Sequence, residues 1–495
     1  MPEKNSSGYV KKSSMTTNLY DVLIVGAGPV GLATAIALYR HGIKNILVID
    51  RTSEFRRVGQ GVDLLPNGLK ALKYIDELAY MRVKEAGGKF LNPPSHNNPD
   101  DKASAIEPEK LSHKRAWNHK NLQGKILRSI PLDFETWFNR YGEGRVFLTW
   151  FDLQTILRNL LPQEIVRANH RCVNVTQDGT WTQISCAGDR APATNPFAHW
   201  EMHKSEPIEI NSTQKFTLDS TQKNFRAKLV IGADGINSTI RQVLYNHSDL
   251  SQWAKPQYSD FSAIGCLQID NVPDEIIQEL ESKYFQGDRI ITLSNAPINS
   301  DSQYLEQPRI ILIRQQENTL GYLLHAPLSL DSLLNKSAKE KIELAVNVLE
   351  KANVPPIFTR LVNLSVPKNL FSRPYYIHPA NISIDSKPIW SSGRIVLVGD
   401  AAHGMPPFAA QGVNQGFEDA ALIATAIAKI IDNKALDDEK TIFNEFSKYE
   451  QIRRPFMMKI QEATMKNHVW SQQQWEDYSE MVYSRKLQQS IGNLA

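Results

Sequence analysis

The chain has 495 residues, enough for two or three cores, because a single hydrophobic core stops growing at roughly 250 to 300 residues. Its 56 Lys and Arg against 53 Asp and Glu give a formal net charge of +3, and no run of like charge marks a nucleic-acid-binding surface. Three cysteines are too few and too scattered for a disulfide framework or a thiolate metal site, which favours a reducing compartment.

The N-terminal residues 1–18 are polar and serine-rich and lack the apolar segment of a signal peptide. No stretch of the chain approaches the roughly 18 consecutive apolar residues that a membrane span requires. We therefore expect a disordered tail at 1–18, a cytoplasmic location and no stable membrane insertion.

Ordered structure is predicted to begin at Tyr20. An apolar run over 21–25 meets the turn Gly26-Ala-Gly-Pro-Val-Gly31 and a helix over 32–39, and a second apolar run over 45–49 ends at Asp50. This pattern predicts two parallel strands joined by a helix. Glycines in such a turn let a pyrophosphate sit on the helix N-terminus, and an acidic residue after the second strand binds a ribose hydroxyl. The candidate dinucleotide-binding residues are Gly26, Gly28, Pro29, Val30, Gly31, Asp50 and Arg51.

Two alternatives to this interpretation stay open. A tight turn between strand and helix can lack any ligand. The position of Arg51 directly after Asp50 also leaves room for a phosphorylated ribose of the NADP type.

The middle of the chain alternates between regular and irregular segments. The pattern predicts an amphipathic helix over 64–78, a long excursion over 91–125 and an insertion at the tip of a β-meander over 187–213. A buried strand over 225–231 then leads into Gly232-Ala-Asp-Gly235.

The later segments predict a second layer and a return to the first. Alternating strands and one amphipathic helix near 339–351 indicate a largely antiparallel layer, and 394–398 reads again as a buried parallel strand. We therefore predict a discontinuous cofactor domain, a substrate domain and a helical C-terminal segment. The cofactor domain comprises 19–90, 126–255 and 386–430. The substrate domain comprises 91–125 and 256–385, and the C-terminal segment comprises 431–495.

Two later motifs carry a family resemblance. The string Gly232-Ala-Asp-Gly-Ile-Asn-Ser-Thr-Ile-Arg241 and the string from Gly399-Asp-Ala-Ala-His403 to Asp419 resemble signatures of the class A, salicylate-hydroxylase-like aromatic-ring hydroxylases. Tyr449-Glu-Gln-Ile-Arg-Arg-Pro455 is similar to the ending of the same pattern, so the resemblance covers roughly 21–455. It implies an α/β fold, in which a Rossmann-like FAD-binding domain of the glutathione-reductase type is interrupted by a mostly antiparallel substrate domain and followed by C-terminal helices.

The resemblance also implies residue roles. Asp400 would bind the sugar chain of FAD, the loop 406–412 would run beside the isoalloxazine ring, and Asp234 and Gly235 would lie near the pyrophosphate and the route of the nicotinamide. A helix over 412–431 would direct its positive N-terminal end at the ring and stabilise reduced flavin. The further candidate cofactor-binding residues are Gly399, Pro407, Gly412, Val413, Asn414 and, just before a Gly-Gln-Gly string, Arg57.

Some residues depart from the family pattern or receive no role. Relatives carry an arginine that contacts the cofactor where this chain has Trp150, which puts the affinity for FAD in doubt. We interpret His403 and His325 as structural and assign no catalytic residue and no metal ligand.

The family implies an FAD-dependent monooxygenase in which NADH or NADPH reduces the flavin and O2 forms a C4a-hydroperoxyflavin, which hydroxylates or epoxidises a small organic, in most cases aromatic, substrate. A flavin-dependent halogenase is disfavoured because its Trp-x-Trp-x-Ile-Pro string is absent. A dehydrogenase or reductase without oxygen insertion and a non-catalytic flavin-binding module remain alternatives. The sequence leaves open whether the protein is a monomer or a homodimer.

Overall fold

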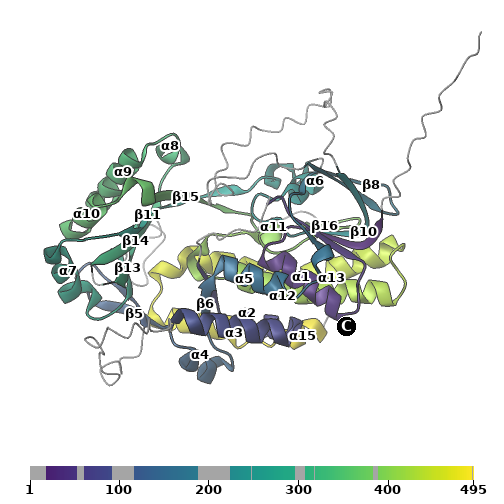
Figure 1. Ribbon diagram of the computed structural model, residues 1–495, viewed down its shortest axis with the longest axis horizontal. Helices are drawn as coiled ribbons and strands as arrows, with labels where there is room; N and C mark the ends of the chain where they lie inside the picture. Colours follow the sequence, from purple (N-terminus) through teal and green to yellow (C-terminus); the bar gives the residue numbers. More distant parts are fainter. Residues whose placement is uncertain are drawn as a thin grey trace, which may run out of the picture.

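A computed structural model describes residues 18–52, 61–91, 116–187, 223–246, 248–295, 307–316, 318–382, 388–492 and 494. Two lobes lie side by side in Figure 1, one around each of two large sheets. Residues 1–17 of the expected tail, almost all of the insertion expected at 187–213, and Arg57 lie outside the described residues.

The first lobe is built on an eight-stranded sheet. Its path runs β16-β17-β10-β1-β2-β7, and β9 and β8 extend it beside β10. The pairs from β17 to β7 are parallel. The apolar runs predict this arrangement, because the strands of a parallel sheet are covered on both faces and are therefore apolar throughout. The strands are β1 (Leu19–Val25), β2 (Ile46–Ile49), β7 (Val166–Arg167), β8 (Arg171–Gln177), β9 (Thr182–Ala187), β10 (Lys223–Gly232), β16 (Ser391–Ser392) and β17 (Ile395–Leu397).

Helices cover the first sheet, and α1 packs against α12 in the middle of the lobe (Figure 1). A small sheet of β3 (Gly61–Leu64) and β6 (Val146–Thr149) lies among them. The helices of this lobe before the C-terminal segment are α1 (Pro29–Arg40), α2 (Pro66–Ile75), α3 (Glu77–Leu91), α4 (Phe134–Tyr141), α5 (Trp150–Arg158), α6 (Thr239–Tyr245), α11 (Asp400–His403) and α12 (Gly412–Asp432).

The single helix expected over 64–78 is wrong in its extent, because α2 ends at Ile75 and α3 begins at Glu77. Asp76 between them has extended backbone, and its carboxylate accepts a hydrogen bond from the Ala79 amide at 2.7 Å. The same carboxylate forms an ion pair with Arg40. An acidic cap at this position ends one amphipathic run and starts the next, which periodicity alone does not reveal.

The second lobe is built on a seven-stranded sheet in the order β15-β11-β14-β13-β12-β4-β5. All its pairs are antiparallel except the pair of β12 and β4. This layer matches the alternating strands read from the sequence. The strands are β4 (Ala116–Lys120), β5 (Ile126–Pro131), β11 (Gln257–Ile269), β12 (Ile290–Ser294), β13 (Arg309–Gln316), β14 (Thr319–Pro327) and β15 (Leu370–Ile377).

Two expectations about this lobe need correction. The boundary expected at 126 assigns β5 to the first lobe, whereas β5 pairs with β4 at the edge of the second sheet. The second lobe also has more helices than the one expected near 339–351, because short helices at loop ends carry too few turns to show a period. They are α7 (Asp274–Leu280), α8 (Leu330–Leu333), α9 (Ala338–Lys351) and α10 (Pro356–Asn363).

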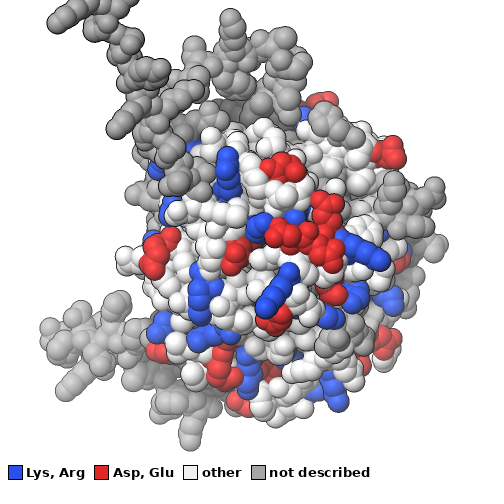
Figure 2. Space-filling model, turned by 90° about the vertical axis from the view of Figure 1, so that its right-hand side faces the viewer, with Lys and Arg blue, Asp and Glu red and all other residues white. Residues whose placement is uncertain are grey.

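The C-terminal segment is helical, as predicted, and packs on the first lobe through α13 (Glu439–Lys466), α14 (Gln472–Tyr483) and α15 (Leu487–Gly492). Figure 2 views the molecule from the side of the first lobe, and acidic and basic side chains are interspersed over the described part of that face. Among the described residues, no helix combines the length and apolar character needed to cross a membrane.

Candidate flavin site

The glycine turn after β1 is closed tightly against the end of β10. Gly26 has φ +110°, and a Cβ there would lie 2.3 Å from the Ala233 carbonyl oxygen. A Cβ on Gly31 would lie 2.0 Å from the Gly26 carbonyl oxygen, so both positions demand glycine. Helix α1 then begins with Gly28 at the N-cap and Pro29 at the first helical position, and no side chain caps it. The free amides of this helix start suit a phosphate.

Asp50 stands at the carboxyl end of β2 beside that turn. Its two carboxylate oxygens accept hydrogen bonds from the backbone amides of Ala27 and Thr52, each at 2.7 Å. A carboxylate has about four acceptor positions, so Asp50 can still accept a ribose hydroxyl. The neighbouring Arg51 is exposed.

Asp234 of the middle motif is used by the protein itself. Its carboxylate accepts hydrogen bonds from the Ser238 hydroxyl and from the amides of Thr239, at 2.7 Å, and Ile240, at 3.2 Å. This aspartate therefore caps the start of the following helix, α6, beside any contact it makes with a cofactor. Gly235 follows with φ +78° and open space around its Cβ position.

The third motif begins at Gly399, where φ +59° and ψ −141° suit glycine and a Cβ would lie 3.1 Å from a methyl group of the half-buried Val30. The first and third motifs therefore meet here. Asp400 comes next, and no described residue hydrogen-bonds to its carboxylate or forms an ion pair with it. Desolvation by the surrounding protein raises the pKa of Asp400, yet its side chain is exposed, so a ligand can reach its oxygens.

Helix α12 begins beside Asp400. A Cβ built on Gly412 would lie 3.5 Å from an Asp400 carboxylate oxygen, and no side chain caps the start of this 21-residue helix. The positive end of the helix dipole therefore lies near Gly412 and Val413. Pro407 in the preceding loop is exposed, as a residue beside a flat ligand would be.

Asn414 differs from the other candidates. Its side-chain amide donates to the carbonyl oxygens of Asp63, at 2.9 Å, and Ala410, and its side-chain oxygen accepts from the Leu65 amide at 2.9 Å. Every polar atom of this buried side chain is thus bound to backbone. The side chain fixes the loop before α12 against β3, and only the backbone amide of Asn414 is left for a cofactor.

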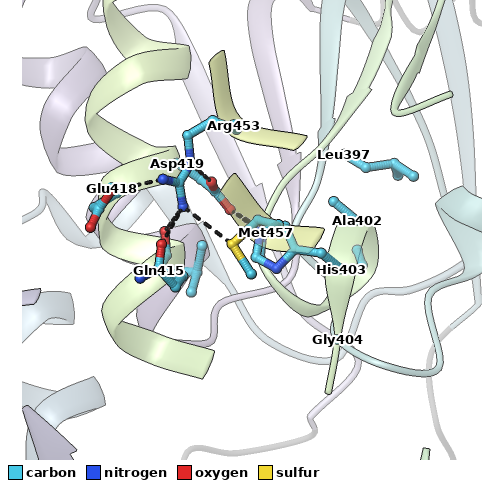
Figure 3. A network of polar contacts seen from close by, with 12 residues as sticks. Leu397, Ala402, His403, Gly404, Gln415, Glu418, Asp419, Arg453 and Met457 are labelled. Carbon is cyan, nitrogen blue, oxygen red and sulfur yellow. Dashed lines mark hydrogen bonds and ion pairs between the residues drawn. The ribbon is translucent and has the colours of Figure 1, made fainter. Parts of the chain in front are cut away.

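A buried ionic network supports the third motif from behind (Figure 3). Asp419 accepts hydrogen bonds from His403 Nε2 at 2.6 Å, from the Gly399 amide at 2.8 Å and from Arg453 Nε at 2.6 Å. Burial alone would raise the pKa of Asp419, but His403 and Arg453 hold it well below its usual value. Arg453 also pairs with Glu418 at 2.7 Å. His403 thus acts as a structural residue, as the sequence indicates.

Trp150 begins α5 and faces the glycine turn, because its ring carbon Cζ2 lies 3.9 Å from the Cβ position of Gly28. An indole therefore occupies this side of the turn, at the position where the family resemblance implies an arginine. Gln154 of the same helix donates to the Ala27 carbonyl oxygen at 2.6 Å, so α5 still supports the turn.

The structure adds a cluster that sequence reasoning missed, where the second sheet meets the loop 406–410. The ring of Phe408 lies 5.1 Å from the ring of His325 and 5.3 Å from the ring of Tyr375, and the guanidinium of Arg309 lies 4.1 Å from the same ring. These residues come from β13, β14 and β15, far apart in the chain. Only the alternation of each strand was readable, and it gives no sign of which polar residue faces the loop.

These features fit FAD. The two uncapped helix starts, the carboxylate of Asp50 and the accessible, unpaired carboxylate of Asp400 provide donors and acceptors for the pyrophosphate and the sugars. Among the described residues, no group of three or more His, Cys, Asp and Glu side chains could hold a metal ion.

Comparisons with known proteins also indicate an FAD-binding domain. A family model described as an FAD binding domain matches residues 19–75 and 357–464. The 6-hydroxynicotinate 3-monooxygenase of Pseudomonas fluorescens is 23% identical over 414 residues, which are 83% of this chain and 83% of that protein.

Two solved structures share the fold. A salicylate hydroxylase in complex with substrate has a TM-score of 0.61 at 14% identity, covering 96% of this chain and 98% of that one. HpxO of Klebsiella pneumoniae, in complex with FAD and uric acid, has a TM-score of 0.57 at 15% identity, covering 96% of this chain and 95% of that one. The chain thus contains an FAD-binding domain, has the two-lobed α/β fold of these FAD-dependent enzymes and is similar in sequence to FAD-dependent monooxygenases over most of its length.

Proposed function

We propose that this monooxygenase hydroxylates a small aromatic substrate with O2, and that NADH or NADPH supplies the electrons. The observation that carries the proposal is the place of Asp400 and the start of α12. They flank the loop that contacts the second sheet through Phe408. A flavin bound by the first lobe would therefore present its ring to side chains of the second. Relatives with this architecture are named for aromatic substrates such as 6-hydroxynicotinate and 3-amino-4-hydroxybenzoate.

The cofactor and the protein have separate tasks in this proposal. Bound FAD supplies the activation of O2 and the transfer of one oxygen atom to the substrate. Protein residues bind FAD, orient the substrate and exclude water. The uncapped start of α12 favours negative charge at its end, which stabilises the reduced, anionic cofactor.

Residue assignments follow from this division. We propose that the first lobe binds FAD and the second binds substrate. The pyrophosphate and adenosine would contact Gly26, Gly28, Pro29, Val30, Gly31, Asp50, Arg51, Arg57, Asp234 and Gly235. The sugar chain and the ring would contact Gly399, Asp400, Pro407, Gly412, Val413 and the backbone of Asn414.

The test begins with the absorption spectrum of the purified protein. NADH and NADPH oxidation and O2 uptake are then measured with a panel of phenols and hydroxylated aromatic acids, and products are identified by mass spectrometry. Substrate-stimulated O2 uptake with a product heavier by one oxygen atom supports the proposal. Flavin reduction without an oxygenated product would favour the dehydrogenase alternative. Absence of flavin after reconstitution would contradict the site itself.

We also propose that the protein works in the cytoplasm as a monomer or a homodimer. The sparse cysteines support the location. Light scattering of the purified protein measures its assembly state, and fractionation of the source cells tests its location.

A further inference from the structure

We infer that Arg309, together with Arg128, selects a substrate that carries a carboxylate on its aromatic ring. This inference rests on the proposed function and narrows its substrate class. It starts from two buried guanidinium groups in the second lobe, neither of which forms an ion pair with a carboxylate among the described residues.

Arg309 is the first residue of β13, and only 6% of its surface is exposed. Its Nε points to His325 Nδ1 at 3.4 Å. No described residue accepts a hydrogen bond from its two terminal nitrogens, and the residue keeps a small exposed fraction. A guanidinium has five N–H donors, so most of the hydrogen-bonding capacity of Arg309 is left for a ligand.

Arg128 lies on β5 at the far edge of the same sheet and is 4% exposed. It donates to the Asn467 carbonyl oxygen at 2.7 Å, points another nitrogen at the His119 ring, and has an enclosed Nε without an acceptor. The charges of the two arginines interact. Burial lowers the pKa of Arg128 to about 10, and burial together with the charge of Arg128 lowers the pKa of Arg309 to about 9.

Two buried like charges without a counter-ion are unfavourable, because each has lost its hydration and gained a repulsive neighbour. A bound anion removes both costs. Arginine is suited to this role, since its planar fork matches the two oxygens of a carboxylate. The charge pattern of this region therefore fits an anionic ligand better than a neutral one.

The surroundings of Arg309 supply the aromatic part of the argument. Phe408, Phe261 and Tyr375 pack with ring centres 5.3 to 5.8 Å apart and at steep angles, and they form an aromatic wall beside the guanidinium. Phe408 belongs to the loop before α12, and Asn467 donates to its carbonyl oxygen at 2.7 Å. The same Asn467 accepts from Arg128, so both arginines are tied to the loop that runs toward Asp400.

Tyr375 and His325 are two further polar residues beside Arg309 in the proposed substrate site. The Tyr375 hydroxyl lies 3.1 Å from His325 Nε2. When His325 Nδ1 accepts from Arg309, the proton of a neutral ring lies on Nε2 and is donated to Tyr375. The Tyr375 hydroxyl hydrogen is then available to a second acceptor. An aromatic carboxylate would thus meet ring faces, a fork of N–H donors and one hydroxyl in a single place.

The experiment compares acids with amides of the same shape on the FAD-loaded protein. Benzoate against benzamide and 3-hydroxybenzoate against 3-hydroxybenzamide are titrated at pH 7.5 by calorimetry, which requires no turnover. We expect each acid to bind at least about tenfold more tightly than its amide, because a charge-assisted bidentate contact is lost with the amide. Equal affinities within both pairs, or no binding of either acid, would overturn the inference.

Variants assign the effect to Arg309. Arg309→Gln should remove the preference for the acid, and Arg309→Lys should retain part of it. The matched control is Arg314→Gln on the same strand, whose guanidinium pairs with Glu281 and lies near Phe285, away from the loop. Its acid preference should stay as in the wild type. If Arg309→Gln does not fold, the comparison of acid with amide in the wild type and in Arg309→Lys still decides the question.

The outcomes also separate this inference from the proposed function. A clear preference for acids without any oxygenated product would leave the anion site standing and contradict the hydroxylase. Oxygenated products formed equally well from acids and amides would support the hydroxylase and contradict the anion site.

Discussion

Asparagine in place of Asp400 should change the affinity for FAD and the stability of the FAD-free protein in opposite directions. The Asp400 carboxylate has no hydrogen-bond or ion-pair partner among the described residues, and desolvation raises its pKa. When a carboxyl group has a raised pKa in the folded state, the protein loses stability as pH rises through that pKa, because the folded state disfavours the ionised form. The charge of Asp400 therefore opposes folding at neutral pH. Asp400→Asn removes that charge and keeps the shape.

The magnitude follows from the type of contact that is lost. A hydrogen bond to a charged group contributes about 1.5 to 3 kcal/mol, which corresponds to a dissociation constant for FAD roughly 10 to 150 times weaker. The FAD-free protein should unfold at an equal or higher urea concentration than the wild type. A residue with a purely structural role would show the reverse, because its loss would destabilise the fold first.

The FAD-free protein is titrated with FAD, and binding is monitored by the quenching of flavin fluorescence. Urea unfolding is measured separately in the absence of FAD. Asp234→Ala is the control, since the Asp234 carboxylate caps α6 through two backbone amides. Its loss should cost about 0.5 to 2 kcal/mol of stability. Unchanged FAD affinity in Asp400→Asn, or a loss of stability like that of Asp234→Ala, would refute the assignment of Asp400 to the cofactor.

Three further predictions concern the support of the site. Trp150→Arg should tighten FAD binding by about tenfold in the same titration, because a guanidinium beside Gly28 would reach a pyrophosphate at the start of α1. Arg453→Met should cost about 3 to 5 kcal/mol in urea unfolding, because Glu418 and Asp419 would remain buried without it. Burial holds the pKa of His378 down to about 3, so folding stability should fall between pH 6.5 and pH 3 by up to about 1.4 kcal/mol per pH unit, and His378→Gln should flatten that slope.

Each of these has a result that contradicts it. Weaker FAD binding in Trp150→Arg would mean that the indole supports the turn in a way an arginine cannot. Wild-type stability in Arg453→Met would show that the network in Figure 3 does not hold the third motif. An acid slope of unfolding that is identical in wild type and His378→Gln would exclude His378 as its source.

Local pattern alone determined the cofactor half of this protein. The glycine turn at 26–31, the apolar runs of β1, β2, β10 and β17, and the helix over 412–431 are each specified by consecutive residues, and the fold contains all of them. The class of enzyme, the α/β fold and the use of FAD were readable because motifs in the right order must bring the right strand ends together. The assignments of single cofactor-binding residues remain predictions.

Contacts between distant segments decided the rest. Asn414 reads as a cofactor ligand in its motif, but Asp63 and Leu65, about 350 residues earlier, use its side chain. Asp76 divides a continuous amphipathic pattern because its carboxylate caps the start of α3 and is also held by the distant Arg40. The segment 126–131 belongs to the second sheet because β4 pairs with it, and that pairing leaves no local pattern.

The cluster around Phe408 in the second lobe shows most clearly that the sequence pattern does not predict contacts between distant segments. Arg309, His325 and Tyr375 are ordinary members of three alternating strands, and their order along the chain says nothing about their meeting at Phe408. A sequence period tells which face of a strand is buried, because side chains alternate across the sheet. Whether a buried arginine has a counter-ion depends on every element packed around it, so only the tertiary structure could reveal that no carboxylate in the described part of the chain pairs with Arg309.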